Sequence, residues 1–326
     1  MALAGCIICN QKEGASPYLD YKKSPTISDD LCVSAFTEKK IYKCDSCESC
    51  FIYPNVNEKE LDNFYSALYS KLPQKLSLHQ NYFPYQNSRY LSQVIFLKNF
   101  LNTNRNINVL EIGSNITSIL PALSFFCESI EFLYFDQIES PIIKKYGGRR
   151  VGAFADPESM QKLIKKDTLD LIHMSHTLEH ISPSNLANML QQCWRTLKFK
   201  GYIFIEVPFQ LEMENFYPPH TLFFSTDGLS SLFKRIGFKI INLELVNGTT
   251  ARTEHHNFER KHISSIIQKL NFLKSSIYGF FMIILVQIPW VNKVFKKLHF
   301  LSCIRKLQTP YDRRPFIRLI AQKSSN

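Results

Sequence analysis

The sequence has little glycine and no long apolar run. Only 11 of its 326 residues are glycine, whereas 45% are hydrophobic and 13% are aromatic, which is the composition of a globular protein with a sizeable core and not of a disordered chain. The most apolar stretch, residues 277–286, is too short for a bilayer crossing, which takes about 20 apolar residues. The length exceeds the roughly 100 to 200 residues of one domain, so we expect one catalytic-sized domain with additions.

The beginning of the sequence lacks a secretory leader. It has no positively charged start followed by an apolar run and a small-residue cleavage site. We therefore expect a cytoplasmic protein, whose nine cysteines stay reduced and serve metal binding or core packing instead of disulfides.

The formal net charge of +11 is a property of the C-terminal tail. Residues 257–326 contain thirteen Lys or Arg against two acids, so the rest of the chain is neutral. A neutral body with a basic tail indicates binding to an anionic membrane surface more than binding of a nucleic-acid backbone in a groove. Because lysines also flank residues 277–286, we predict either a buried or dimer-forming helix there, or a peripheral anchor over residues 277–297 at the inner face of the membrane.

Cysteines cluster near the start in two CxxC pairs, Cys6 with Cys9 and Cys44 with Cys47. Two thiolates three residues apart can reach one ion, and two such pairs supply the four tetrahedral ligands of a structural zinc. Cys50 offers a second pairing with Cys47, but we predict ligation by the two CxxC pairs in a zinc-ribbon-like module. Such a site is closed and does no chemistry. The alternative is a set of unligated cytosolic cysteines.

Apolar runs alternate with helical stretches in the middle of the chain, which predicts an α/β fold with a doubly wound, mostly parallel, Rossmann-like sheet. The first run ends at Gly113, and the next ends at Asp136. A strand that breaks at glycine into a helix is where α/β folds bind a nucleotide. An acid that ends the following strand can accept hydrogen bonds from both ribose hydroxyls. The four runs are residues 109–112, 130–136, 169–174 and 201–208.

These segments resemble the class I S-adenosylmethionine-dependent methyltransferases, specifically the zinc-ribbon-bearing subgroup that often modifies sugars in polysaccharide or antibiotic pathways. The resemblance covers about residues 1 to 245 and lies in the order of blocks. NVLEIGSN resembles the cofactor loop, LYFDQ the acidic strand end, and DLIHMSHTLEHI the fourth strand with its following helix. LKFKGYIFIEVP, HTLFFSTDGLSSLFKRIGF and the ribbon segment KCDSCESCFIYP are similar to further blocks. The resemblance implies that S-adenosylmethionine is bound by Glu111, Gly113, Asn115, Asp136 and Asp156.

The cofactor loop departs from the family in one respect. The family usually has three glycines there, whereas this chain keeps Gly113 and has Asn115 and Thr117 at the other two positions. Asn tolerates left-handed backbone angles, but a β-branched side chain narrows the pocket or strains the backbone. A catalytically inactive scaffold with a methyltransferase fold is therefore an alternative function.

His176, Glu179 and His180 follow the third apolar run at a spacing that places three side chains on one helical face. The string is formally the HxxEH of inverted zinc metallopeptidases. We reject that interpretation, because those enzymes need the motif within a long helix and here a strand precedes it. The segment also resembles that of some quinone-pathway O-methyltransferases, which bind a divalent metal with similarly placed residues, although their first acidic ligand corresponds to His176 here. A metal ion at this segment is therefore an alternative that the sequence does not predict. In the methyltransferases that the chain resembles, the segment borders the acceptor pocket.

Transfer of a methyl group from a sulfonium needs a well-placed nucleophile and removal of its proton. A histidine with a pKa near neutrality can take that proton, and an adjacent carboxylate orients it. Our candidates for the general base are His176, His180 and His220, with Glu179 as the orienting carboxylate. A packing role for His180 is the alternative.

We predict four units and one leading function. The function is methyl transfer from S-adenosylmethionine to a small hydroxylated acceptor, such as a lipid- or nucleotide-linked sugar of cell-surface polysaccharide biosynthesis. An RNA methyltransferase is a weaker alternative, because the sequence has no NPPY-type or cysteine-nucleophile motif. The units are a zinc-ribbon-like module (1–72), a linker and helix (73–104), a Rossmann-like methyltransferase domain (105–250) and a basic extension with an apolar helix (251–326).

Overall fold

A computed structural model describes the parts of the chain that hold both predicted sites. The described residues are 5–20, 36, 38–56, 58–70, 83–102, 104–114, 118–153, 155–211, 216, 218–246 and 315–324. The predicted loop positions Asn115 and Thr117, and the predicted helix or anchor over residues 277–297, lie outside these ranges. No helix within them is long and apolar enough to cross a membrane.

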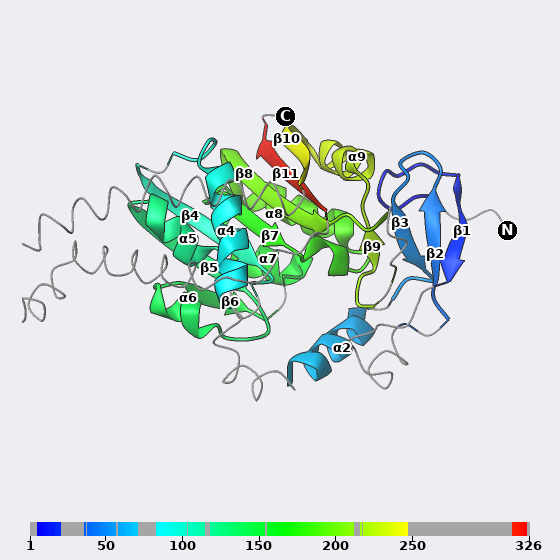
Figure 1. Cartoon of the computed structure of the whole chain (residues 1–326), viewed down its shortest axis with the longest axis horizontal. Helices are drawn as coiled ribbons and strands as arrows, with labels where there is room; N and C mark the ends of the chain where they lie inside the picture. Colours follow the sequence, from blue (N-terminus) through cyan, green and yellow to red (C-terminus); the bar gives the residue numbers. More distant parts are fainter. Residues whose placement is uncertain are drawn as a thin grey trace, which may run out of the picture.

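The centre of the molecule is a seven-stranded sheet with the order β10-β11-β8-β7-β4-β5-β6 (Figure 1). The five strands from β8 to β6 are mutually parallel, whereas β11 is antiparallel to both of its neighbours. The prediction of a mostly parallel α/β sheet is therefore confirmed. The strands are β4 Asn106–Ile112, β5 Ser129–Phe135, β6 Arg149–Gly152, β7 Leu169–Ser175, β8 Leu197–Pro208, β10 Phe238–Val246 and β11 Phe316–Lys323.

Helices cover both faces of this sheet, each over its own apolar core. Successive strand residues point to opposite faces, so Val109 of β4 packs in one core and Leu110 in the other. The core around Val109 includes residues of α4 Phe83–Leu97, α5 Leu120–Phe126 and α6 Pro141–Lys145. The core around Leu110 includes residues of α7 Pro157–Leu163, α8 Leu186–Thr196 and α9 Thr226–Ile236.

The N-terminal cysteines lie at the end of a second, antiparallel sheet with the order β1-β2-β3-β9, at one end of the molecule (Figure 1). Its last strand, β9, comes from the middle of the chain and pairs with β3. Cys6 and Cys44 belong to the same apolar core as Leu110 of the main sheet. The cysteine module is thus packed into the larger domain. Its elements are β1 Ala15–Asp20, β2 Lys40–Cys44, β3 Cys50–Tyr53, α2 Glu58–Ser70 and β9 Leu222–Phe223.

The end of the chain differs from its expected place in a separate extension. Residues Phe316–Lys323 form β11, which lies inside the main sheet between β8 and β10. Arg318 and Lys323 give this segment a basic appearance in the sequence, yet both side chains are buried. The domain therefore includes part of the segment assigned to the extension. At the other boundary, α4 begins at Phe83, inside the predicted linker.

Candidate functional site

The two segments predicted to bind cofactor and acceptor meet at the carboxyl edge of the main sheet. In the sheet, β5 and β6 lie on one side of β4, whereas the next strand of the chain, β7, lies on the other side of β4. The ends of β4 and β7 therefore form the topological switch point, where open α/β sheets bind ligands. Gly113 follows β4, and His176 follows β7.

Position 113 requires a glycine for two reasons, which are its backbone angle and the closeness of the Thr177 side chain. Its φ of 74° lies in the left-handed region, and a Cβ there would approach Thr177 Oγ1 to 2.3 Å. The Thr177 hydroxyl in turn donates a hydrogen bond to the carbonyl oxygen of Ile112 (2.9 Å). The predicted cofactor loop and the predicted acceptor segment are therefore in direct contact at their first residues.

Asp136 lies directly after β5, where the sequence placed it. Its Oδ1 accepts a hydrogen bond from the backbone N–H of Ile138 (2.9 Å), and its Oδ2 accepts one from the Ser114 hydroxyl (3.4 Å). Ser114 follows Gly113, so the end of β4 and the end of β5 are joined through this carboxylate. An acid held in this way between two strand ends fits the chemistry of a ribose-binding group.

The other predicted cofactor ligands have structural partners. Glu111 is buried, and it accepts hydrogen bonds from the Ser118 hydroxyl and from the backbone N–H of Ile119 (3.2 Å). It therefore holds the residues that follow the loop. Asp156 caps the first turn of α7, because its Oδ1 accepts a hydrogen bond from the backbone N–H of Ser159 (2.9 Å).

The HxxEH segment does not form the predicted helical face. β7 ends at Ser175, and only a single 3-10 turn, Leu178–His180, follows. His176 has a φ of 54°, an uncommon angle for a residue with a side chain, and such outliers cluster at functional sites. The N–H of His176 bonds to the carbonyl oxygen of Glu206 (2.8 Å) on β8, which continues the pairing of β7 with β8 up to this residue. The absence of a helix here also excludes the metallopeptidase geometry.

Glu179 is the buried centre of this turn. Its Oε1 lies 3.5 Å from Nδ1 of His176 and 3.8 Å from Nε2 of His180, and its side chain is only 1% exposed. Burial alone would raise the pKa of Glu179, but the neighbouring imidazoles outweigh it and lower this pKa to about 2. Burial lowers the pKa of His180, and the Glu179 carboxylate opposes that effect. The cluster therefore combines an anionic carboxylate with imidazoles.

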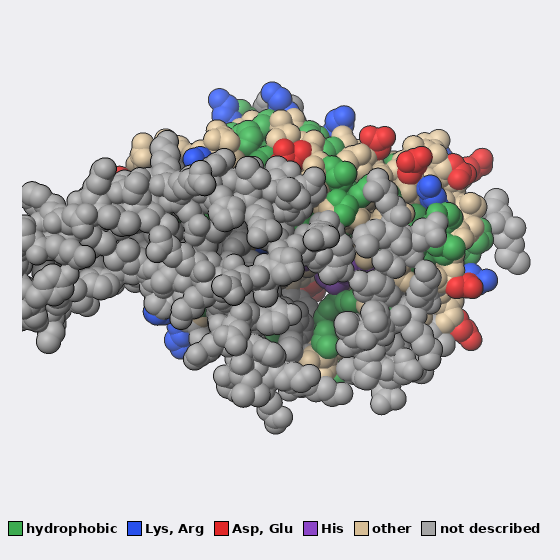
Figure 2. All heavy atoms as spheres, viewed as in Figure 1, with side chains coloured by type: hydrophobic (Ala, Val, Ile, Leu, Met, Phe, Trp, Pro, Cys, Tyr) green, Lys and Arg blue, Asp and Glu red, His purple; other side chains and the backbone are tan. Residues whose placement is uncertain are grey.

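His220, far away in the sequence, joins the same cluster. Its ring centroid lies 4.7 Å from that of His180. Its Nδ1 contacts Oε1 of Gln210 at 2.6 Å, and Nδ1 of His180 contacts the hydroxyl of Tyr65 on α2 at 2.8 Å. Histidine side chains are visible within a recess of the molecule, beside acidic and hydrophobic ones (Figure 2). Three of the predicted catalytic residues, Glu179, His180 and His220, are thus brought together, and His176 borders them.

The cysteine module supports this cluster through Thr221. The backbone N–H of Thr221 donates to the carbonyl oxygen of Glu179 (2.8 Å), and its own carbonyl oxygen accepts from Ile52 of β3 (3.0 Å). At the next turn, Ser225 donates its hydroxyl to the carbonyl oxygen of Cys47. Sequence reasoning missed these residues, because backbone pairing between such distant segments leaves no local pattern.

A buried polar network lies behind His176. Nε of Arg318 on β11 contacts Oε2 of Glu206 at 2.6 Å, and Gln93 donates its Nε2 to Oε1 of Glu206 (2.7 Å). Nε2 of His176 lies 3.9 Å from the same Oε1. Burial would raise the pKa of Glu206, but Arg318 and Arg89 outweigh it and hold this pKa below its usual value.

The four predicted zinc ligands converge. The Sγ atoms of Cys6 and Cys47 lie 3.8 Å apart, those of Cys9 and Cys44 lie 3.7 Å apart, and all four lie within 4.8 Å of one another. A tetrahedral zinc with Zn–S bonds of about 2.3 Å requires sulfur atoms about 3.8 Å apart, so the cluster fits the metal. Cys50, the rival ligand, lies outside the cluster, and burial raises the pKa of its thiol to about 12.

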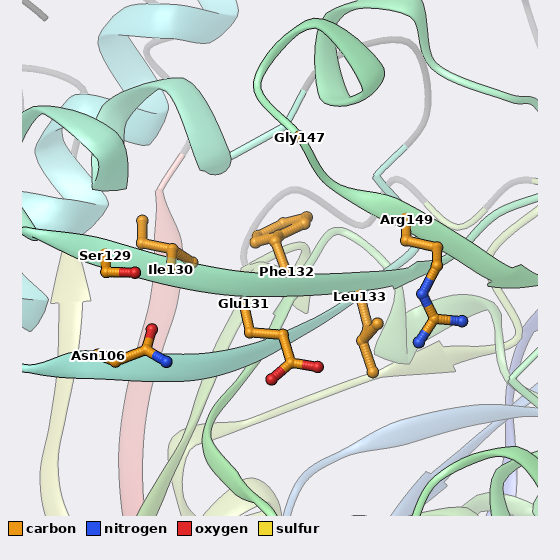
Figure 3. Close-up of a pocket in the computed structure, with 8 residues that line it drawn as sticks. All are labelled: Asn106, Ser129, Ile130, Glu131, Phe132, Leu133, Gly147 and Arg149. Atoms are coloured by element: carbon orange, nitrogen blue, oxygen red, sulfur yellow. The ribbon is translucent and has the colours of Figure 1, made fainter. Parts of the chain in front are cut away.

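One surface depression lies at the opposite edge of the main sheet. It has a volume of about 330 Å³ and is lined by the amino ends of β4, β5 and β6 (Figure 3). Ligands of open parallel sheets bind at the carboxyl ends of the strands. This depression is therefore separate from the candidate site. Its lining residues are Asn106, Ser129, Ile130, Glu131, Phe132, Leu133, Gly147 and Arg149.

Residues 83–243 match the family model of the methyltransferase domain. The match includes β4 to β8, the strand ends at Gly113 and Asp136, and the whole HxxEH turn. This part of the chain is accordingly similar to methyltransferase domains. Comparison with the curated proteins finds no match.

The solved structures that match this chain are distant from it. A phosphoethanolamine N-methyltransferase 2 of Haemonchus contortus, in complex with S-adenosyl-L-methionine, is 15% identical with a TM-score of 0.40, over 71% of this chain and 52% of that one. A SAM-dependent methyltransferase of Archaeoglobus fulgidus is 17% identical with a TM-score of 0.43, over 73% and 94%. The [4+2]-cyclase SpnF is 13% identical with a TM-score of 0.42, over 72% and 81%. The similarity to the first of these spans about half of that protein's length.

Proposed function

We propose that the protein transfers a methyl group from S-adenosylmethionine to a small hydroxylated acceptor. The observation that carries this proposal is the contact between Gly113 and Thr177, which joins the strand end suited to the cofactor with the turn that carries the histidines. A methyl donor and its acceptor must meet within reacting distance, so their sites must be neighbours.

The roles of the residues follow from their contacts. Asp136 would accept hydrogen bonds from the ribose, and Gly113 would let the backbone approach the cofactor. When bound, S-adenosylmethionine supplies the electrophilic methyl group. His176 is the most exposed imidazole of the turn, at 26%, and borders Glu179, so it would take the proton from the acceptor hydroxyl.

The acceptor class rests on the resemblance of the sequence to zinc-ribbon methyltransferases of sugar pathways. We propose a sugar of cell-surface polysaccharide or related biosynthesis, carried on a lipid or nucleotide. A structural zinc on the four N-terminal cysteines would fix the ribbon, which supports the acceptor turn through Thr221. The basic tail would bring a lipid-linked acceptor near the site.

A catalytically inactive scaffold remains the second candidate, because Asn115 and Thr117 stand where the resembled family has glycines. One calorimetric titration of the full chain with S-adenosylmethionine separates the two candidates. Micromolar or tighter binding, followed by transfer of labelled methyl groups to a panel of nucleotide sugars, lipid-linked sugars and RNA, supports the enzyme and identifies its acceptor class. No heat of binding would support the scaffold.

A further inference from the structure

The Glu179 carboxylate is buried without a hydrogen bond. Within the part of the chain that the structure describes, neither Oε1 nor Oε2 has a donor, although both atoms are inaccessible to solvent. A buried carboxylate that lacks partners costs several kcal/mol, so native proteins pair such groups or place them on metal ions. Glu179 therefore needs a positively charged or hydrogen-bonding partner at this point.

The neighbouring imidazoles stabilise the charge of this carboxylate but do not reach hydrogen-bonding distance. Nδ1 of His176 lies 3.5 Å from Oε1 of Glu179, and Nε2 of His180 lies 3.8 Å from it. Both distances exceed the 2.7 to 3.2 Å of an N–H···O hydrogen bond. The 3.8 Å between Glu179 and His180 is close to the separation of two ligand atoms around one ion.

Three groups surround such a centre. One potential ligand atom each from Glu179, His180 and His220 lies within 4.8 Å of the other two. Ligand bonds of about 2.0 to 2.2 Å, which carboxylates and imidazoles make to zinc, place the ligand atoms of one ion about 3 to 3.6 Å apart. The bound of 4.8 Å is wider than this, so binding of an ion would draw the three atoms together.

In both His180 and His220, the ring nitrogen Nδ1 already has a polar partner, which leaves Nε2 to face the ion. Nδ1 of His220 faces the amide oxygen of Gln210 at 2.6 Å, and an amide oxygen only accepts, so this Nδ1 carries the proton and Nε2 keeps its lone pair. Nδ1 of His180 faces the Tyr65 hydroxyl at 2.8 Å. Outer hydrogen bonds of this kind orient metal-binding histidines and fix their tautomer.

We propose that Glu179, His180 and His220 bind one divalent transition-metal ion, at a second metal site distinct from the cysteine cluster. Two imidazoles and one carboxylate suit Mn²⁺, Fe²⁺, Co²⁺ or Zn²⁺, whereas four thiolates select zinc. Three protein ligands leave coordination positions open. If the proposed methyl transfer holds, an acceptor oxygen takes an open position, and His176, which is outside the ligand set, stays available as the base.

The chemical difference between the sites allows a selective test with Mn²⁺. Mn²⁺ competes poorly for thiolates, so the zinc-loaded full chain can be titrated with Mn²⁺ while electron paramagnetic resonance counts the free ion. We expect about one bound Mn²⁺ per chain. Glu179→Gln and, separately, His220→Gln should weaken binding at least tenfold. Gln210→Ala should weaken it about 10- to 100-fold, as the loss of an outer partner does.

Matched control variants distinguish the metal ligands from residues that only lie near them. Glu158→Gln, an exposed acid on α7, and His176→Ala should each bind Mn²⁺ within a few-fold of the parent. Circular dichroism and zinc content establish that each variant is folded, and if Glu179→Gln fails to fold, His220→Gln decides. The proposal is overturned if the parent takes up neither Mn²⁺ nor a second equivalent of Zn²⁺, or if the folded ligand variants bind like the parent.

A parallel titration with S-adenosylmethionine keeps the two proposals apart. Cofactor binding without metal uptake overturns the metal site and leaves the proposed methyl transfer standing. Metal uptake without cofactor binding supports the metal site and contradicts the proposed function.

Discussion

Arg318 and Glu206 form a buried ion pair between β11 and β8, with Nε of the arginine 2.6 Å from Oε2 of the glutamate. The arginine side chain is 1% exposed and the glutamate side chain is fully buried. Glu206 also lies 3.9 Å from Nε2 of His176. The pair therefore joins the last described strand of the chain to the wall of the candidate site.

Replacement of Arg318 by Met should lower the free energy of unfolding by about 3 to 5 kcal/mol, because the Glu206 carboxylate is left buried with its main counter-charge removed. Chemical denaturation monitored by circular dichroism measures this loss. The double variant Arg318→Met with Glu206→Gln should recover part of it, since the unpaired charge is then absent. A single variant within about 0.5 kcal/mol of the parent contradicts the prediction.

The same pair should make stability depend on pH. The folded-state pKa of Glu206 lies below its unfolded value of about 4.3, so the carboxylate's contribution is complete above that pH and is lost as the pH falls through the folded pKa. Urea unfolding of the parent and Glu206→Gln at a series of pH values from about 6 to about 3 tests this dependence. The stability difference between them should shrink toward acid. A difference that stays constant over this range contradicts the assignment.

Replacement of Asp136 by Asn should weaken binding of S-adenosylmethionine by about 1 to 3 kcal/mol, because hydrogen bonds to a charged acceptor are lost. Isothermal titration calorimetry measures the change. Glu131→Gln is the matched control, since Glu131 is an exposed acid of the same strand and lies at the opposite edge of the sheet. Equal affinities of Asp136→Asn and the parent would remove Asp136 from the cofactor site.

Replacement of Cys44 by Ser should remove one equivalent of zinc, because a closed site with three thiolates holds the ion far less tightly. Thr221 links the ribbon to Glu179, so hydrogen exchange at the Thr221 amide should accelerate in the same variant. Metal analysis and exchange mass spectrometry measure the two effects. Cys50→Ala should keep the zinc, and its loss in that variant would show that the ligand set is different.

The basic tail predicts reversible binding to anionic vesicles that weakens with salt, since charges near a membrane are screened over a Debye length of about 8 Å at physiological salt. Changing Phe280, Phe281 and Ile284 together to Ser should reduce binding even at low salt, because apolar insertion is lost. Vesicle sedimentation measures both. A folded parent protein that ignores anionic vesicles rules out the anchor and leaves a core or dimer helix.

The sequence alone predicted the features that depend on neighbouring residues. The glycine that ends β4 and the acid that ends β5 were found because a strand's apolar run and its terminating residue are adjacent in the chain. The two CxxC pairs were found for the same reason, since each pair is a local turn. Parallel sheet geometry then sufficed to predict that Gly113 and Asp136 share one edge.

Only the tertiary structure decided how these local units combine. The HxxEH spacing suggested a helical face, but the hydrogen bond from His176 to Glu206 on the neighbouring strand continues the sheet to this residue, and only a 3-10 turn follows. Arg318 was counted with the basic tail, whereas its buried pairing with Glu206 makes it part of the core. His220 lies beside His180 because the next residue, Thr221, bonds through its backbone N–H to Glu179. Each of these outcomes depends on contacts between residues far apart in the chain, whose energies local patterns do not encode.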